Sequence, residues 1–313
     1  MSTVVSAAQL SARRRLSNRR ETVAALLFIS PWILGFLIFT VWPVIYSGYL
    51  SFTDYDVIND PNFVGLENYV TMFEDPRIAL SLTNTLIYTI LSVPAHIIVA
   101  LVLAMLLLRA ARASGFFRTV FFLPKMTPAV AVGVLFLLLF NGQDGLINKV
   151  LRAIGLPAPY WTTDPFWVKP GLVLISLWAM GSSIVILLAA LKNVPVELYE
   201  SARIDGANLW QQTTRITVPM ISSTIFFLVI INTIAGFQMF TEAYTAFFGS
   251  GNTTYSNDAA LFFVIYLFQQ GFEFLNMGYA SAMAWLLFLV ITIFTVVQFV
   301  VSRRLVYYEG DQR

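Results

Sequence analysis

The stretch Glu197–Pro219, ELYESARIDGANLWQQTTRITVP, is a polar segment between two strongly apolar runs of the chain. The flanking runs lie near Gly171–Leu191 and Ile221–Thr241, and each has about the 20 residues that a transmembrane helix needs. The polar segment itself has the length of about two short helices. A polar segment held between two spans lies at a membrane face. We therefore expect a helical membrane protein that presents this segment to a partner.

The composition supports a membrane protein. Of the 313 residues, 58% are hydrophobic and only 12% are charged, whereas soluble domains carry about 25% charged residues. This balance predicts an all-α polytopic membrane protein. The absence of Cys excludes disulfides, Cys metal sites and thiol nucleophiles, and the single His, His96, excludes a His-cluster metal site. No Gly-Lys pair occurs, so a nucleotide-binding P-loop is also excluded.

Six segments are long enough to cross a membrane. They lie near Val23–Val44, Asn84–Leu108, Thr119–Phe140, Gly171–Leu191, Ile221–Thr241 and Ala280–Val301. A seventh apolar run, Ala259–Gln269, is too short to cross, and we expect an interfacial or re-entrant helix on the outer side. The first segment follows a run of arginines but is too long for a cleaved signal peptide, so we expect a retained span. The predicted division is an N-terminal tail at 1–22, a transmembrane domain at 23–302 that contains the loop 193–219, and a C-terminal tail at 303–313.

The basic residues predict the orientation of these spans. With the N-terminus inside, the inner tails and loops carry fourteen Lys and Arg residues, and the outer loops carry four. Lys125 lies within the third predicted span. Because basic loops stay in the cytoplasm, both termini and the loop 193–219 are predicted to be cytoplasmic. The first outer loop, Ser51–Leu82, is acidic, and we interpret it either as a solvated loop or as a docking surface for an external partner.

Helix start and stop signals divide the polar segment in two. Pro195 suits the first turn of a helix, and Gly206 is the residue type that ends one in the left-handed conformation. Asn208 can cap a second helix, which we expect to end near Arg215. An alternative is an amphipathic connector that lies among lipid head groups. The acid Glu200 beside an anionic leaflet argues against that alternative, as does a second acid one residue before the predicted corner.

The same segment resembles a known motif. Glu200-Ser201-Ala202, Asp205-Gly206-Ala207 and Ile216-Thr217-Val218-Pro219 resemble the EAA loop of permease subunits of binding-protein-dependent ABC importers, with the spacing from Gly206 to Ile216 that the loop requires. Ser201, Val218 and Thr213 depart from the usual pattern.

Further stretches are similar to sugar-importer permeases of the maltose and glycerol-phosphate type. In chain order they are Val64-Gly65-Leu66-Glu67-Asn68-Tyr69, Phe121-Phe122-Leu123-Pro124, Gly145-Leu146-Ile147-Asn148 and Gly278-Tyr279-Ala280-Ser281-Ala282. The resemblance covers nearly the whole chain, except that residues 247–252 replace a T-x-G-G-P pattern common in that family.

The resemblance implies a permease subunit of an importer for a sugar or sugar-like solute, such as a di- or oligosaccharide or a sugar derivative. It implies a second homologous permease, two ATPase subunits and an extracytoplasmic solute-binding protein as partners, with membrane lipid around the spans and no nucleic acid. ATP and Mg²⁺ would bind the ATPase subunits, so this chain would hold no cofactor, metal or catalytic residue. The implied location is the cytoplasmic (inner) membrane of a bacterium or archaeon, and the implied mechanism is alternating access driven by the ATPases. The implied ATPase-coupling residues are Glu200, Ala202, Asp205, Gly206, Ala207, Ile216 and Pro219.

Polar side chains within spans usually face the interior of the bundle, and those here are candidates for a substrate pathway. They are Asn232, Trp178, Gln238, Ser182, Thr127 and Lys125. Helix–helix hydrogen bonding is the open alternative for each of them. Lys125 could snorkel, pair with an acid or bind an anionic group of the substrate, and we expect a packing role for His96.

Two other function classes are weighed against the importer. An ion-coupled secondary transporter would need acids within the membrane, and Glu242 is the only clear example near a span. A membrane enzyme would need a nucleophile or paired acids, which this inventory lacks. A glycerol-phosphate compound is a further substrate option for the same ABC machinery.

Overall fold

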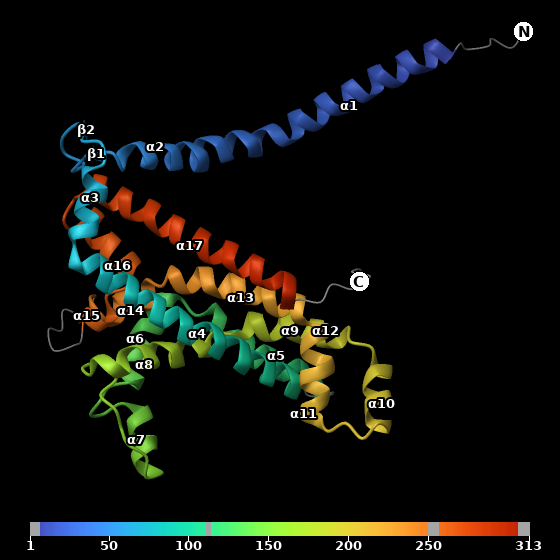
Figure 1. The fold of residues 1–313 in the computed structure, drawn as a ribbon, viewed down its shortest axis with the longest axis vertical. Helices are drawn as coiled ribbons and strands as arrows, with labels where there is room; N and C mark the ends of the chain where they lie inside the picture. Colours follow the sequence, from blue (N-terminus) through green and yellow to red (C-terminus); the bar gives the residue numbers. More distant parts are fainter. Residues whose placement is uncertain (1–6, 111–113, 250–256, 306–313) are drawn as a thin grey trace, which may run out of the picture.

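The computed structural model describes residues 7–110, 114–249 and 257–305, which form an almost entirely helical protein (Figure 1). The described strands are β1 (Thr53–Asp54) and β2 (Asn62–Phe63), which pair antiparallel with Thr53 opposite Phe63. The predicted all-α polytopic fold is confirmed. Arg112 and Arg313, which contributed to the predicted orientation, lie outside the described residues, as do residues 250–256 of the predicted last outer loop.

Within the described part of the chain, four helices are long and apolar enough to cross a membrane, and two bent helix pairs raise that number to six if each pair crosses once. The first span is one continuous rod made of α1 (Ala7–Phe36), a π-helical turn at Leu37–Val41 and α2 (Trp42–Leu50). None of the side chains in its apolar window is buried. The rod meets the other helices near its end, where Gly48 lies against the ring of Trp285 (Figure 1).

The second span begins earlier than predicted. It follows α3 (Glu67–Glu74) as α4 (Pro76–Arg109), so it starts at Pro76 and not at Asn84. The side chain of Asp75 accepts a hydrogen bond of 2.8 Å from the backbone N–H of Arg77, and Pro76 occupies the first helical position. These two local signals extend the helix into the segment that had been assigned to the outer loop.

The third and fourth predicted spans are bent rather than straight. In the third, α5 (Ser114–Phe122) and a 3₁₀ turn at Leu123–Met126 meet α6 (Ala129–Leu139) at 98°. Pro124 and Pro128 flank this break, and proline removes a helical hydrogen-bond donor and disfavours helix in the residue before it.

In the fourth span, α8 (Pro165–Trp178) and α9 (Gly181–Lys192) meet at 58°. A Cβ on Gly181 would lie 2.3 Å from the carbonyl oxygen of Phe121, so glycine permits α9 to approach α5 directly after the bend.

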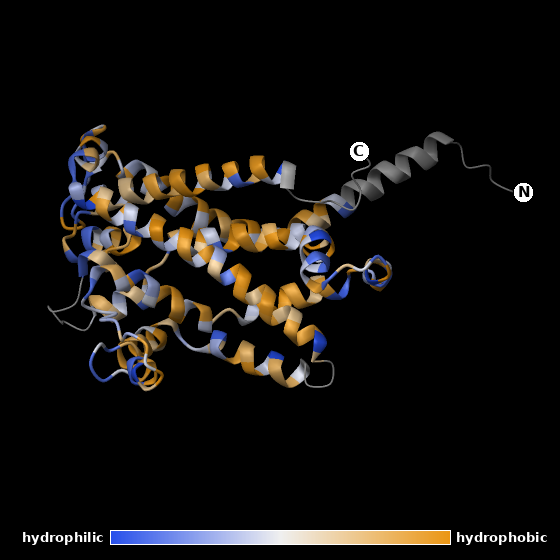
Figure 2. Cartoon of the chain, turned by 60° about the horizontal axis from the view of Figure 1, so that its bottom comes forward, coloured by the Kyte–Doolittle hydropathy of each residue, from blue (hydrophilic) through white to orange (hydrophobic). Residues whose placement is uncertain are grey.

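The remaining elements are the last two spans and the shorter helices and turns. They are α7 (Leu146–Ala153), α10 (Val196–Ile204), α11 (Leu209–Gln212), a π-helical turn at Thr213–Thr217, α12 (Val218–Met220), α13 (Ser222–Phe237), α14 (Thr241–Phe247), α15 (Asn257–Ala260), α16 (Phe263–Phe268), a π-helical turn at Gln269–Glu273 and α17 (Met277–Leu305). Hydrophobic residues dominate the helices between the two ends, and hydrophilic residues gather at the ends (Figure 2). The start of α1, the loop α10–α12 and the end of α17 lie at one end, and the β1–β2 hairpin, α3, α7 and α15 lie at the other (Figure 1).

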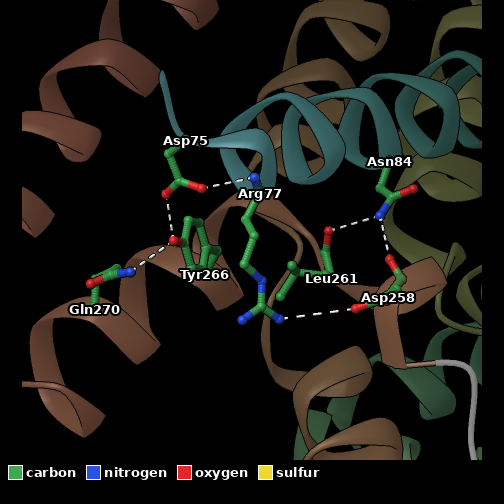
Figure 3. Close-up of polar contacts among 7 residues, drawn as sticks. All are labelled: Asp75, Arg77, Asn84, Asp258, Leu261, Tyr266 and Gln270. Atoms are coloured by element: carbon green, nitrogen blue, oxygen red, sulfur yellow. Dashed lines mark hydrogen bonds and ion pairs between the residues drawn. The ribbon is translucent and has the colours of Figure 1, made fainter. Parts of the chain in front are cut away.

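The seventh apolar run forms two short helices, α15 and α16, that are buried within the protein. Phe262, Phe263 and Ile265 have no exposed surface, which excludes a helix that lies among lipid head groups. The backbone break between α15 and α16 is capped by α4 (Figure 3). The amide Nδ2 of Asn84 donates to the carbonyls of Asp258 at 2.7 Å and Leu261 at 3.0 Å. Broken helices in an apolar surrounding need such partners, because an unpaired backbone group there costs several kcal/mol.

Candidate functional site

A cavity of about 370 Å³ lies where the bent third span meets α4, α8, α13 and α14. Its walls combine apolar residues with an unusual density of polar ones. The polar wall residues are Tyr88, Ser92, His96, Lys125, Thr127, Ser176, Asn232, Gln238, Thr241 and Glu242. A cavity of this size and mixed lining, set between helices, is the usual form of a small-molecule site.

One wall is a stripe along α4. Tyr88, Ser92 and His96 are spaced four residues apart, so they share one face of the helix and line the cavity one above the other. The ring Nε2 of His96 lies 3.0 Å from Oγ of Ser183, which fixes the ring against α9. His96 therefore packs as expected, but it also forms part of the cavity wall.

The other polar groups come from helix breaks. Lys125 and Thr127 lie at the 98° break of the third span, and Gln238 and Glu242 lie at the break between α13 and α14. In membrane proteins irregular backbone is tolerated where it is covered by protein or lines a cavity. The breaks turn polar residues of two spans towards one space.

Four of the six sequence-predicted pathway residues are brought together in this cavity, namely Lys125, Thr127, Asn232 and Gln238. The amide Nδ2 of Asn232 donates back to the carbonyl of Leu228 at 2.8 Å. The two from the fourth span are not among its wall residues. Trp178 is the last residue of α8 before the 58° bend and is 43% exposed, and Ser182 follows the bend on α9.

Sequence reasoning missed four polar wall residues. Tyr88, Ser92, Ser176 and Thr241 were not singled out, although the four-residue spacing of the first two with His96 was a readable signal of a shared polar face. Among the described residues, no group of three or more His, Asp or Glu side chains is placed to hold a metal ion.

The loop at the opposite end is built as two helices around a glycine corner. Gly206 has φ of +76°, in the left-handed region. The N–H of Ala207 donates to the carbonyl of Ala202 at 2.8 Å, and the N–H of Gly206 donates to that of Arg203 at 3.1 Å. This pair of bonds is the Schellman motif, which satisfies the last carbonyls of α10. The predicted end of the first helix at Gly206 is therefore confirmed.

A capping box starts the second half of the loop. The N–H of Gln211 donates to Oδ1 of Asn208 at 2.9 Å, and the N–H of Asn208 donates to Oε1 of Gln211 at 2.8 Å. The helix that follows is less regular than predicted, because Arg215 falls in a π-helical turn that leads on to α12. The hydroxyls of Tyr199 and Thr217 lie 2.9 Å apart and tie the two halves together.

The loop presents large apolar side chains that no other described residue covers. Ile204 is 86% exposed and Trp210 is 75% exposed, on either side of the corner. Neither residue was singled out from the sequence. Glu200 is exposed on α10 and has no hydrogen-bond or ion-pair partner among the described residues. Large exposed apolar side chains that lie beside polar or charged residues are typical of a surface that contacts another protein.

The seven implied coupling residues form one continuous segment with different exposures. Glu200, Asp205 and Gly206 are exposed, and Ala202 and Ala207 are half-buried at the corner. The two remaining residues, Ile216 and Pro219, are half-buried where the loop enters α13, and Ile216 packs on the apolar cluster of the spans. The segment thus links an exposed corner to the body of the protein.

Comparisons with known proteins identify the family. The family model described as binding-protein-dependent transport system inner membrane component matches residues 96–307. The chain is 39% identical over 303 residues to the probable ABC transporter permease protein YesP of Bacillus subtilis (strain 168), which covers 96% of this chain and 97% of that protein. It is 34% identical over 292 residues to the lactose transport system permease protein LacF of Rhizobium radiobacter, covering 91% of this chain and 96% of that protein.

A solved structure agrees with this assignment. The chain superposes with a TM-score of 0.77 and 26% identity on a chain in the crystal structure of a bacterial alginate ABC transporter in complex with alginate pentasaccharide-bound periplasmic protein. The match covers 92% of this chain and 96% of that one. On the family match and on relatives aligned over nearly its whole length, the chain belongs to the family of binding-protein-dependent transport system inner membrane components.

Proposed function

We propose that the chain is a transmembrane permease subunit that imports a sugar, in the form of a di- or oligosaccharide or a sugar derivative. The observation that carries the proposal is the polar cavity of about 370 Å³ among the spans of a chain whose relatives include a lactose permease. The likeness to a subunit of an alginate transporter supports the same substrate class. A periplasmic protein loaded with sugar accompanies that transporter, which supports an extracytoplasmic binding protein as the partner here.

In this proposal, separate ATPase subunits supply the energy for transport. Two ATPase subunits bind ATP and Mg²⁺ and dock on the loop 193–219, and this chain contributes no catalytic residue or cofactor. The exposed Ile204 and Trp210 supply apolar contacts, and the carboxylate of Glu200 pairs with a cation of the ATPase. Rigid-body movement of the spans then alternates access to the cavity. The loop and both ends of the described chain lie at the same end of the bundle, which supports cytoplasmic termini (Figure 1).

A second, homologous permease completes the pathway. The first span has no buried side chain in its apolar window, so its surface is left for lipid and for a partner subunit. The acidic segment Ser51–Asp75, which precedes α4, faces the binding protein at the other end. The tails 1–22 and 303–313 remain outside the transmembrane domain 23–302.

The test is reconstitution of the whole complex. The chain is co-expressed with the second permease, the ATPase and the binding protein, and purified through a tag on the ATPase. Glu200→Ala and Gly206→Pro are expected to reduce both ATPase association and sugar-stimulated ATP hydrolysis. Gly155 has the same φ of +76° at the opposite end of the molecule, so Gly155→Pro is the matched control.

The variants test the docking assignment, and transport without an ATPase tests the alternative function. Unchanged association and stimulation in both would refute the docking assignment. A chain that transports solute in proteoliposomes without any ATPase would instead be an ion-coupled secondary transporter, with Glu242 as its candidate ion-binding acid.

A further inference from the structure

Two opposite charges stand unpaired on the walls of the cavity. Lys125 and Glu242 both line it, yet neither has a hydrogen-bond or ion-pair partner among the described residues. The described ion pair of this chain, Arg77 with Asp258, lies at the outer end, away from the cavity. Charges within the membrane region are costly unless they pair with each other or serve the transported solute. Because Lys125 and Glu242 do not pair with each other, their charges are available to interact with the transported solute.

The two charges occupy different ends of the cavity. Along the third span the cavity lining runs from Lys125 to Val132, and the backbone carbonyl of Glu242 lies against Gly133, just past the far end of that stretch. Along α4 the lining runs from Tyr88 to His96, which is two helical turns or a rise of about 12 Å. The cavity therefore has a cationic end and an anionic end, with Ser92 and Asn232 among the residues that line it. That length accommodates more than one sugar ring.

A neutral sugar does not need the ammonium group of Lys125. Its hydroxyls can both donate and accept, and the amides and hydroxyls of Asn232, Gln238 and Thr127 offer both kinds of partner. An ammonium group offers donors only, and its bonds to a carboxylate are about twice as strong as neutral ones. At the other end, a carboxylate accepts hydrogen bonds from sugar hydroxyls without requiring a charged group.

We propose that the cavity accepts an acidic oligosaccharide, one sugar carboxylate pairing with the ammonium of Lys125 while Glu242 accepts hydrogen bonds from hydroxyls of another ring. This inference rests on the proposed function as a sugar permease. It narrows the substrate class to sugars that carry an acid group, and it assigns Lys125 as the residue that selects them.

The experiment uses the complete complex of both permeases, ATPases and binding protein in proteoliposomes. The probes are matched pairs of di- and trisaccharides that differ only at the sixth carbon: galacturonic against galactose, glucuronic against glucose, and mannuronic against mannose units. In the wild-type complex the acidic member of at least one pair is taken up, at a rate at least tenfold above that of its neutral partner.

The variants then locate that preference. Lys125→Gln is expected to lower uptake of the acidic sugar at least tenfold and to reduce the preference over the neutral partner, whereas Lys125→Arg retains most of it. Lys149→Gln removes a charge from the exposed face of α7, outside the cavity, and is expected to change nothing. The elution profile and thermal transition of each complex confirm that the variants assemble.

Each contrary result has a different meaning. Uptake of neutral members only, or an equal loss for both members in Lys125→Gln, overturns the acidic class and leaves the sugar permease intact; the equal loss would indicate that Lys125 pairs with an acid of the second permease. If no sugar of any pair is taken up, the proposed function itself fails, and the inference with it. The wild-type comparison decides the substrate class even where Lys125→Gln does not assemble.

Discussion

The hydroxyl of Tyr266 donates a hydrogen bond of 2.5 Å to Oδ2 of Asp75, and this bond joins the buried α16 to the cap of α4 (Figure 3). The same oxygen accepts a bond of 3.0 Å from the hydroxyl of Tyr279 on α17. The other oxygen of Asp75 caps α4 through the N–H of Arg77. One carboxylate thus connects three helices at the end that carries the β1–β2 hairpin, and Gln270 extends the network by donating to Tyr266 at 2.8 Å.

Removal of the Tyr266 hydroxyl should lower stability measurably. Tyr266 is 3% exposed, and a hydrogen bond to a charged group contributes about 1.5–3 kcal/mol. Tyr266→Phe is therefore expected to lower the thermal transition of the purified complex in detergent. Tyr160→Phe is the control, because Tyr160 is 56% exposed and its hydroxyl has no partner among the described residues. An equal change in the two variants would contradict a structural role for the network.

The same bond should give a pH dependence with a definite sign. Burial, followed by the hydrogen bond to Asp75, raises the pKa of Tyr266 to about 12, above its ordinary value of 10.0. The folded state then favours the protonated hydroxyl, so its contribution is complete below about pH 10 and is lost as pH rises towards 12. The stability difference between wild type and Tyr266→Phe should be constant from neutral pH to about pH 9 and shrink above pH 10. A stability difference between wild type and Tyr266→Phe that grows above pH 10 would contradict the raised pKa of Tyr266.

Asn84 should be essential to the break between α15 and α16. Asn84→Leu would leave the carbonyls of Asp258 and Leu261 without their donor, at about 1–3 kcal/mol for each unsatisfied group. Thr85→Val would remove the bond that Oγ1 accepts from the N–H of Phe263 at 2.9 Å and the bond that it donates to the carbonyl of Ser81 at 2.8 Å. It leaves one backbone group of α16 without its partner, so it should cost less than Asn84→Leu. Hydrogen exchange in α16 should rise in both variants. Asn59→Ala, at an exposed side chain, serves as control and should stay within about 0.5 kcal/mol.

Gly278 should tolerate no side chain. Its N–H donates to the carbonyl of Tyr55 at 3.1 Å, and a Cβ would lie 2.0 Å from the carbonyl oxygen of Thr53. Gly278→Ala must therefore push α17 away from the β1–β2 hairpin, at a cost typical of overpacking, about 1–3 kcal/mol. Gly115→Ala has nothing within 4 Å of the new Cβ and should be neutral or slightly stabilising. Equal thermal transitions for the two variants would show that the hairpin is not packed as described.

Local signals account for what the sequence could predict. The corner at Gly206 and the cap at Asn208 depend on hydrogen bonds between residues at most five apart, so residue type and spacing were sufficient. The spans followed from the length of apolar runs. Asp75 and Pro76 were equally local signals for an early start of α4, and reading them would have corrected the boundary at Asn84.

Long-range contacts account for most of the rest. The burial of α16 depends on Asn84, which is separated from Asp258 by 174 residues, and composition cannot distinguish such a buried segment from one in lipid head groups. The bends depend partly on packing, and they decide which polar residues share the cavity: Lys125 is included and Trp178 is not. Helical wheels drawn through straight third and fourth spans could not have separated these outcomes.

The exposed corner of the loop should bind its partner through apolar contact. Ile204 and Trp210 are 86% and 75% exposed, and burial of one large apolar side chain contributes about 1.5–3 kcal/mol, or roughly 10–100-fold in affinity. The double variant Ile204→Ser and Trp210→Ser should therefore retain its thermal transition but lose at least tenfold in affinity for the ATPase subunits, as measured by titration of the purified permease pair. Ile154→Ser, on a residue 63% exposed at the opposite end, should leave that affinity unchanged. Unaltered affinity in the double variant would move the ATPase contact away from this corner, to the charged residues of α10.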